Sequence, residues 1–92
     1  MQIFLVEDHA QLMNTLTQSL GALGIHVHAC GDGVAADAQL QRHAFDVVVL
    51  DLALPRMGGI DILRRLRQRG DTVPVLVLTA SGEIQDLSLI HI

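Results

Sequence analysis

Residues 45–51 of this chain read FDVVVLD, a stretch whose four consecutive apolar residues end at an acid, Asp51. Two more apolar runs have the same form, because residues 3–6 (IFLV) stop at Glu7-Asp8 and residues 73–78 (VPVLVL) stop at Thr79. Runs of this kind are typical of parallel strands that are buried on both faces of a sheet. If all three are parallel strands of one sheet, their polar ends lie at one edge of it.

That edge is the place where open α/β sheets bind ligands, in the crevice beyond the carboxyl ends of the strands. The carboxylates of Glu7, Asp8 and Asp51 and the hydroxyl of Thr79 are all expected there. Carboxylate oxygens suit Mg2+, and a divalent cation neutralises the charge of a phosphoryl group. The sequence therefore predicts a site for a divalent cation and a phosphoryl group.

Helical patterns separate the apolar runs. Leucines at positions 12, 16, 20 and 23 recur on one predicted helical face, and Leu63 and Leu66 point inward from another helix. Strands that alternate with helices of about ten residues imply βαβ crossovers and a parallel sheet. We predict strands over 2–6, 25–30, 45–50 and 73–78, and helices over about 10–23, 34–42 and 60–69.

Composition limits the classes of function. A chain of 92 residues makes one domain at most, and its net charge of −4 with no lysine lacks the electrostatic footprint of a nucleic-acid-binding protein. The one cysteine, Cys30, excludes an internal disulfide, and no apolar stretch approaches the roughly 20 residues that cross a bilayer. The N-terminus lacks the charged region of a signal peptide. We expect a cytoplasmic protein that does not bind nucleic acid or membranes through this segment.

Asp51 is the candidate nucleophile, because the loop through Gly59 separates it from the next predicted helix and it cannot cap that helix. A carboxylate that attacks phosphorus forms an acyl phosphate. For Asp8 an alternative is the N-cap of the first helix, with Gln11 completing a capping box. Glu7 is not explained by capping, since two adjacent acids at a buried strand end repel each other unless a cation or solvent relieves them.

Other patterns offer alternatives. Gly31, Gly33 and Ala36 fit the dinucleotide pattern G-x-G-x-x-A, but the run before them is short and contains two histidines. A haloacid-dehalogenase-like phosphatase needs a second Asp where Ala53 stands. His26 and His28 share one strand face and are more readily explained as solvent-facing residues of an edge strand than as metal ligands.

Taken together, these residues resemble the receiver domain of bacterial response regulators. The resemblance covers Met1 to about Asp86, and residues 46–80 are most similar to receivers joined to winged-helix DNA-binding domains, the OmpR/PhoB class. The matching positions are Glu7-Asp8, Asp51, Leu54-Pro55, Gly59 and Thr79-Ala80.

The resemblance implies an α/β, flavodoxin-like (CheY-like) doubly wound parallel sheet of strand order 2-1-3-4. It also implies that Asp51 is the phosphoacceptor, with Thr79 as the phosphate-sensing hydroxyl and the backbone N–H of Ala80 as a donor to the phosphate. Mg2+ would be bound by Asp8, Asp51 and the backbone carbonyl of Ala53, and by Glu7 through water.

The implied partners are a sensor histidine kinase that supplies the phosphoryl group and an output domain, winged-helix and DNA-binding, in the intact protein. A phosphorylation-dependent homodimer of the intact protein belongs to the same implication. The domain would accept a phosphoryl group and would not act as an enzyme on other substrates. At most it would catalyse its own phosphorylation and dephosphorylation.

Receivers also place a lysine at the end of a fifth strand, and this chain has no lysine. We therefore expect residues 1–86 to be an incomplete receiver, without its fifth strand and last helix, in which Glu83–Asp86 begin a fourth helix. Residues 87–92 (LSLIHI) are similar to the translation of a transposon end used in sequencing libraries. We expect this tail to be adapter-encoded and not native.

Overall fold

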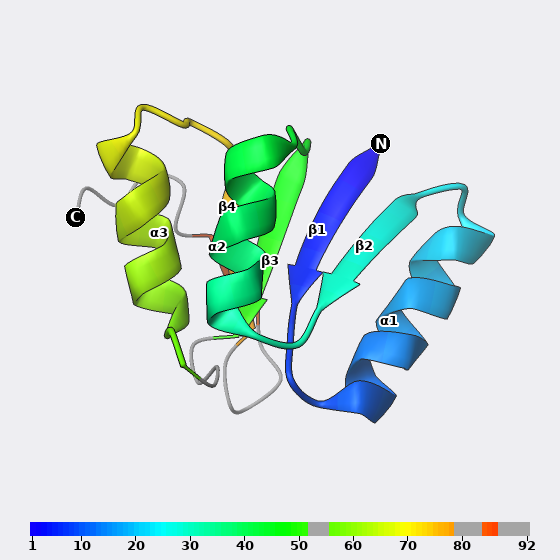
Figure 1. Cartoon of the computed structure of the whole chain (residues 1–92). Coiled ribbons are helices and arrows are strands. Elements are labelled where there is room, and N and C mark those ends of the chain that lie inside the picture. Colours follow the sequence, from blue (N-terminus) through cyan, green and yellow to red (C-terminus); the bar gives the residue numbers. More distant parts are fainter. Residues whose placement is uncertain (52–55, 79–83, 87–92) are drawn as a thin grey trace.

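The computed structural model describes residues 1–51, 56–78 and 84–86. Strands and helices alternate through most of this length (Figure 1). In chain order the elements are β1 (Gln2–Val6), α1 (Ala10–Ala22), β2 (His26–Cys30), α2 (Gly33–Arg42), β3 (Val47–Asp51), α3 (Gly59–Gln68), β4 (Val75–Leu78) and β5 (Ile84–Asp86).

The strands form one sheet in the order β2-β1-β3-β4-β5, and β1 to β4 are parallel. The predicted order 2-1-3-4 is therefore confirmed. Val6 at the end of β1 is the register partner of Leu50 in β3, and Asp51 is the partner of Leu78 in β4. This register brings the carboxyl ends of β1, β3 and β4 to one edge.

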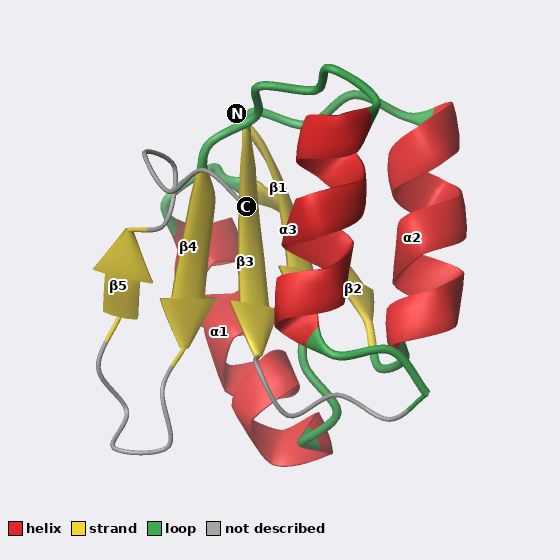
Figure 2. Ribbon diagram, turned by 90° about the vertical axis from the view of Figure 1, so that its left-hand side faces the viewer, coloured by secondary structure: helices red, strands yellow, loops and turns green. Residues whose placement is uncertain are grey.

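Helices cover the two faces of the sheet unequally. Figure 2 shows α2 and α3 together on one face and α1 on the other. Alternate residues of β1, β3 and β4 point under α2 and α3, where Leu63 and Leu66 are fully buried as predicted. The main members of this core are Phe4, Val6, Val48, Leu50, Val75, Val77, Ala36, Leu40, Ile62, Leu63 and Leu66.

The opposite face is only partly covered. No residue of α1 is buried, and two of the four leucines predicted on one helical face, Leu12 and Leu23, are 38% and 75% exposed. A single helix of 13 residues is too narrow to cover a face that also includes β3 and β4. It leaves an apolar cavity of about 200 Å³, lined by Ile3, Leu5, Leu16, Leu20, Val49, Leu76 and Leu78.

Residues 84–86 form a strand, so the expectation that they begin a fourth helix is wrong. β5 pairs with β4 in antiparallel orientation, with Ile84 opposite Leu78 and Asp86 opposite Leu76. The free edge of β4 offers backbone N–H and C=O groups that a short segment satisfies by pairing. Among the described strands, β5 takes the edge at which the family would place a fifth parallel strand.

A buried carboxylate joins α2 to α3. Asp37 is 4% exposed, and its oxygens accept hydrogen bonds from Arg65 Nη1 at 3.5 Å, Arg69 Nη1 at 3.1 Å and Gln41 Nε2 at 3.0 Å. The arginines of α3 therefore do more than form a solvated helix face.

In the described part of the chain, no helix is long and apolar enough to span a membrane.

Candidate functional site

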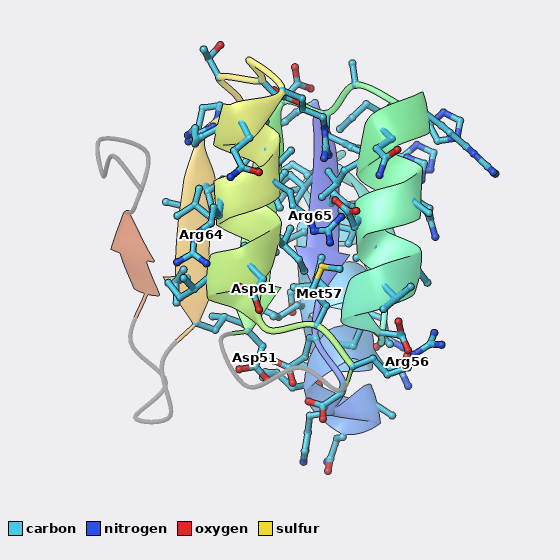
Figure 3. All side chains as sticks on the ribbon, turned by 60° about the vertical axis from the view of Figure 1, so that its left-hand side comes forward. Asp51, Arg56, Met57, Asp61, Arg64 and Arg65 are labelled. Carbon is cyan, nitrogen blue, oxygen red and sulfur yellow. The ribbon has the colours of Figure 1, made fainter. Side chains whose placement is uncertain are left out.

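The carboxyl ends of β1 and β3 bring three acids together. Glu7, Asp8 and Asp51 each present a carboxylate oxygen, and these oxygens all lie within 4.8 Å of one another. Figure 3 shows Asp51 at the end of the sheet, beyond the N-terminal end of α3. The predicted meeting of these three side chains at one sheet edge is thus present in the structure.

The three carboxylates differ in burial. Glu7 is 4% exposed, Asp51 is half-buried and Asp8 is exposed. Burial raises the pKa of Glu7 above its ordinary value, and the nearby carboxylates of Asp51 and Asp8 raise it further. A hydrogen bond of 2.9 Å from the backbone N–H of His9 to Glu7 Oε1 acts in the opposite direction.

This donor set fits a divalent cation. Three negative charges at short range repel one another, and a cation among them converts that repulsion into attraction. Mg2+ is commonly held by one or two carboxylates together with retained waters, and the exposure of Asp8 leaves the cluster open to solvent. The buried, half-buried and exposed acids together therefore supply carboxylate ligands and leave room for retained waters.

The N-cap of α1 is His9 and not Asp8. His9 has extended backbone angles, and its Nδ1 accepts a hydrogen bond of 3.4 Å from the N–H of Leu12. The capping alternative for Asp8 is therefore wrong, and its carboxylate takes part in the acidic cluster instead. Sequence reasoning missed this cap because histidine is not among the residues that favour N-cap positions.

Three predicted site residues, Ala53, Thr79 and Ala80, lie outside the described residues, as do Leu54 and Pro55. Their neighbours in sequence are placed, since Asp51 and Leu78 are register partners at the ends of β3 and β4. The structure thus fixes where the chain leaves both strands, at the edge that holds the acidic cluster.

Comparison with known protein families agrees with this arrangement. The family model described as "Response regulator receiver domain" matches residues 3–89. The chain belongs to this family. Receiver domains are the phosphoacceptor modules of two-component response regulators, and they bind Mg2+ at their acidic phosphorylation site.

Curated relatives of the receiver are transcriptional response regulators. The chain is 40% identical over 86 residues to the transcriptional regulatory protein TctD of Salmonella typhimurium, covering 94% of this chain and 38% of the relative. It is 44% identical over 86 residues to the response regulator PmrA of Pseudomonas aeruginosa, covering 94% of this chain and 39% of PmrA. The chain therefore spans less than half the length of these relatives.

Solved structures share the receiver fold. The non-phosphorylated HemR receiver domain of Leptospira biflexa superposes with a TM-score of 0.80 at 34% identity, over 89% of this chain and 66% of that one. The chemotaxis response regulator CheY4 of Vibrio cholerae gives a TM-score of 0.82 at 26% identity, over 89% of this chain and 70% of that one.

The alternatives considered from the sequence are not favoured in the receiver. β2 lies at the edge of the sheet, whereas a dinucleotide site needs its glycine turn after a central strand. A Cβ on Gly33 would lie 1.9 Å from the carbonyl oxygen of Met57, so the receiver's own loop packs against this turn. His26 and His28 are exposed as predicted, and their rings stack at 4.9 Å.

The sequence did not predict a hydrogen bond that lies close to the acidic site, between Asp32 and Arg56. Asp32, at the N-terminus of α2, accepts a hydrogen bond from Arg56, which follows the loop after Asp51. An aspartate before a helix signals an N-cap, but nothing in the sequence signals a second partner 24 residues away.

Proposed function

We propose that Asp51 is the residue of this receiver that accepts the phosphoryl group, in a reaction that depends on Mg2+. The observation that carries the proposal is the position of Asp51 at the end of β3, with the carboxylates of Glu7 and Asp8 within 4.8 Å. A lone strand-end acid would have no means of binding the cation that phosphoryl transfer needs.

In the proposed reaction a carboxylate oxygen of Asp51 attacks the phosphorus of the donor. An O–P bond forms, the N–P bond of a phosphohistidine breaks, and its electron pair returns to the imidazole nitrogen of the donor. Bound Mg2+ would neutralise the charge of the transferring group. Asp8, Asp51 and the carbonyl oxygen of Ala53 would bind the Mg2+ ion directly. Glu7 would bind the ion through water.

The same proposal assigns roles to two residues beyond β4. The hydroxyl of Thr79 would donate a hydrogen bond to a phosphoryl oxygen, and the N–H of Ala80 would donate another. A phosphoryl group adds roughly −1.5 to −2 charges and new acceptor oxygens, which would draw the hydroxyl toward it. Movement of Thr79 would then carry the signal to the partner surface.

We propose a sensor histidine kinase as the phosphodonor and a winged-helix DNA-binding output domain in the intact protein, by analogy with the transcriptional relatives. A cytoplasmic location and a phosphorylation-dependent homodimer of the intact protein are part of this proposal. The receiver would accept and release its own phosphoryl group without turning over a separate substrate.

Ligand-induced thermal stabilisation tests the proposal against the dinucleotide alternative. Mg2+ with beryllium fluoride, a phosphoryl mimic, should raise the melting temperature of the chain, whereas NAD should not. Asp8→Ala should weaken Mg2+ binding more than Glu7→Ala does, because Asp8 is assigned the direct contact. Asp61→Asn, which removes an acid of α3, is the matched control and should bind Mg2+ as the wild-type chain does. Equal Mg2+ affinity in all four proteins would contradict the assignment.

We also propose that residues 1–86 are receiver sequence and that residues 87–92 are not native. The family match runs to residue 89 and so reaches into the first part of this segment. Amplifying the locus from source DNA without transposon-based library preparation tests the proposal. A lysine codon about two dozen residues after Thr79 is expected, the space that one helix and one strand need with their loops. The same six codons followed by a stop would refute it.

A further inference from the structure

A groove of about 590 Å³ lies on the surface formed by α3 and the residues just before it. The described residues that line this arginine groove are Arg56, Met57, Asp61, Arg64, Arg65 and Gln68. Figure 3 shows Arg65 and Met57 between α3 and α2, and Arg64 on the side of α3 nearer β4. Three cationic side chains therefore meet here with one acidic side chain.

The arginines of the groove reach solvent. The side chains of Arg56, Arg64 and Arg65 are 63%, 49% and 54% exposed. Nη1 of Arg64 lies 3.4 Å from a carboxylate oxygen of Asp61. Nη1 of Arg65 lies 3.5 Å from a carboxylate oxygen of Asp37. Contacts of this length are weak, and a guanidinium carries five N–H donors, so both arginines can donate to a further acceptor.

The positive charge of this chain is concentrated around the groove. The chain has six basic residues, all of them arginines, and every one except Arg42 lies within residues 56–69. The same range contains one acid, Asp61, whereas the whole chain has a net charge of −4. The acidic remainder of the chain would repel a long polyanion such as DNA, which follows the protein surface over a greater distance. A short acidic segment would meet mainly the arginines.

The lining of the groove favours a protein segment over a small apolar ligand. Sites for small molecules are lined mostly by apolar side chains, whereas Met57 is the only apolar side chain among the described lining residues. Arginine binds carboxylates through two parallel N–H···O bonds, and methionine adapts its shape to an apolar neighbour. The groove thus suits a segment in which carboxylates surround an apolar side chain.

We propose that the arginine groove binds an acidic segment of a partner protein. Carboxylates of the partner pair with Arg64 and Arg65, and an apolar side chain of the partner contacts Met57. The inference does not depend on the proposed phosphorylation, because the acidic cluster and the groove have no described residue in common.

The first test measures binding of the full chain to a fluorescent peptide of glutamate, alanine and leucine by fluorescence anisotropy. The same peptide with glutamine in place of every glutamate is the control ligand and should bind far more weakly. Raising the salt concentration from about 0.1 M to about 1 M shortens the screening length from about 10 Å to about 3 Å, so it should weaken binding of the glutamate peptide. Equal binding of the two peptides, or no binding of the glutamate peptide, would overturn the proposal.

Variants of single arginines separate the groove from the net charge of the chain. Arg64→Gln and Arg65→Gln should each lower the affinity for the glutamate peptide about two- to fivefold, the fold-change that corresponds to one exposed ion pair. Arg64→Glu, which reverses the charge, should lower it further. Arg42→Gln is the matched control, since Arg42 is exposed in the last turn of α2 and the change in net charge is the same. A loss of affinity in Arg42→Gln as large as that in Arg64→Gln would overturn the proposal.

Amide chemical shifts measured by NMR locate the bound peptide. The glutamate peptide should shift the amides of Met57 and of α3, and should leave those of α1, on the other face of the sheet, unchanged. Shifts centred on α1 would contradict the proposed site. Oligothymidylate should not displace the peptide, and displacement at a lower concentration than that of the unlabelled peptide would assign the groove to nucleic acid and overturn the proposal.

Discussion

Replacing Gly33 by alanine should destabilise the receiver and disturb its acidic site. The added Cβ would lie 1.9 Å from the carbonyl oxygen of Met57, so the loop or α2 must move by more than an ångström to reach an ordinary contact. Overpacking of this kind costs about 1–3 kcal/mol. Alanine regains at most about 0.5–1 kcal/mol of helix preference over glycine. The expected net loss lies in the upper half of the resulting range of about 0–2.5 kcal/mol, because the obstacle is backbone and cannot rotate away.

The assay is thermal and urea unfolding, with Gly21→Ala as the opposite control. Gly21 lies inside α1, and a Cβ there would meet nothing within 4 Å. That variant should gain about 0.5–1 kcal/mol from helix preference alone. For a domain of this size each kcal/mol shifts the melting temperature by about 4–8 °C, so the two variants should move in opposite directions. A Gly33→Ala protein as stable as wild type, with unchanged Mg2+ affinity, would show that the close contact with Met57 does not hold the loop.

Three further predictions concern other parts of the molecule. Because the pKa of Glu7 is raised, the Mg2+-free folded chain binds this proton more tightly than the unfolded chain, and stability should fall as the pH rises above the ordinary value of 4.5. Glu7→Gln should flatten that fall in urea unfolding with EDTA, and an unchanged slope would exclude Glu7 as its source. Asp37→Asn should lower the free energy of unfolding by about 1.5–3 kcal/mol, the range for hydrogen bonds to charged groups, since Arg65 and Arg69 lose a charged acceptor. A decrease in the free energy of unfolding below about 0.5 kcal/mol would show that the interactions of Asp37 with Arg65 and Arg69 are no stronger than ordinary surface ion pairs. The apolar cavity beside α1 should make the 92-residue chain self-associate, and Leu76→Thr should reduce this self-association, as measured by sedimentation velocity. If the Leu76→Thr variant self-associated as strongly as the wild-type chain, the surface that mediates association would lie elsewhere.

The sheet and its acidic edge were predictable because their signals are local. Each apolar run carries its own strand signal, and the parallel arrangement of β1 and β3 then brings Glu7 and Asp51 to the same edge without further information. α3 was predictable for the same reason, since Leu63 and Leu66 recur at helical spacing above a buried strand.

The features that escaped prediction depend on what packs against what. Leu12 and Leu23 belong to the leucine pattern predicted on one helical face, but both are exposed, because burial of a helical face depends on which neighbouring elements pack against it. Ile84–Asp86 form a strand because the edge of β4 is open to pairing, which the local sequence does not encode. The contact between Asp32 and Arg56 depends on how the loop after β3 meets α2, a relation between distant segments.

Mapping the phosphorylated residue tests the central claim most directly. The chain is incubated with Mg2+ and acetyl phosphate, the acyl phosphate is trapped with borohydride, and the modified residue is located by mass spectrometry. The account predicts modification of Asp51, its loss in Asp51→Asn, and normal labelling in Asp46→Asn, whose carboxylate lies just before β3 and accepts a hydrogen bond from the N–H of Gln2. Labelling at full stoichiometry in Asp51→Asn, or a modification mapped to Glu7 or Asp8, would contradict it.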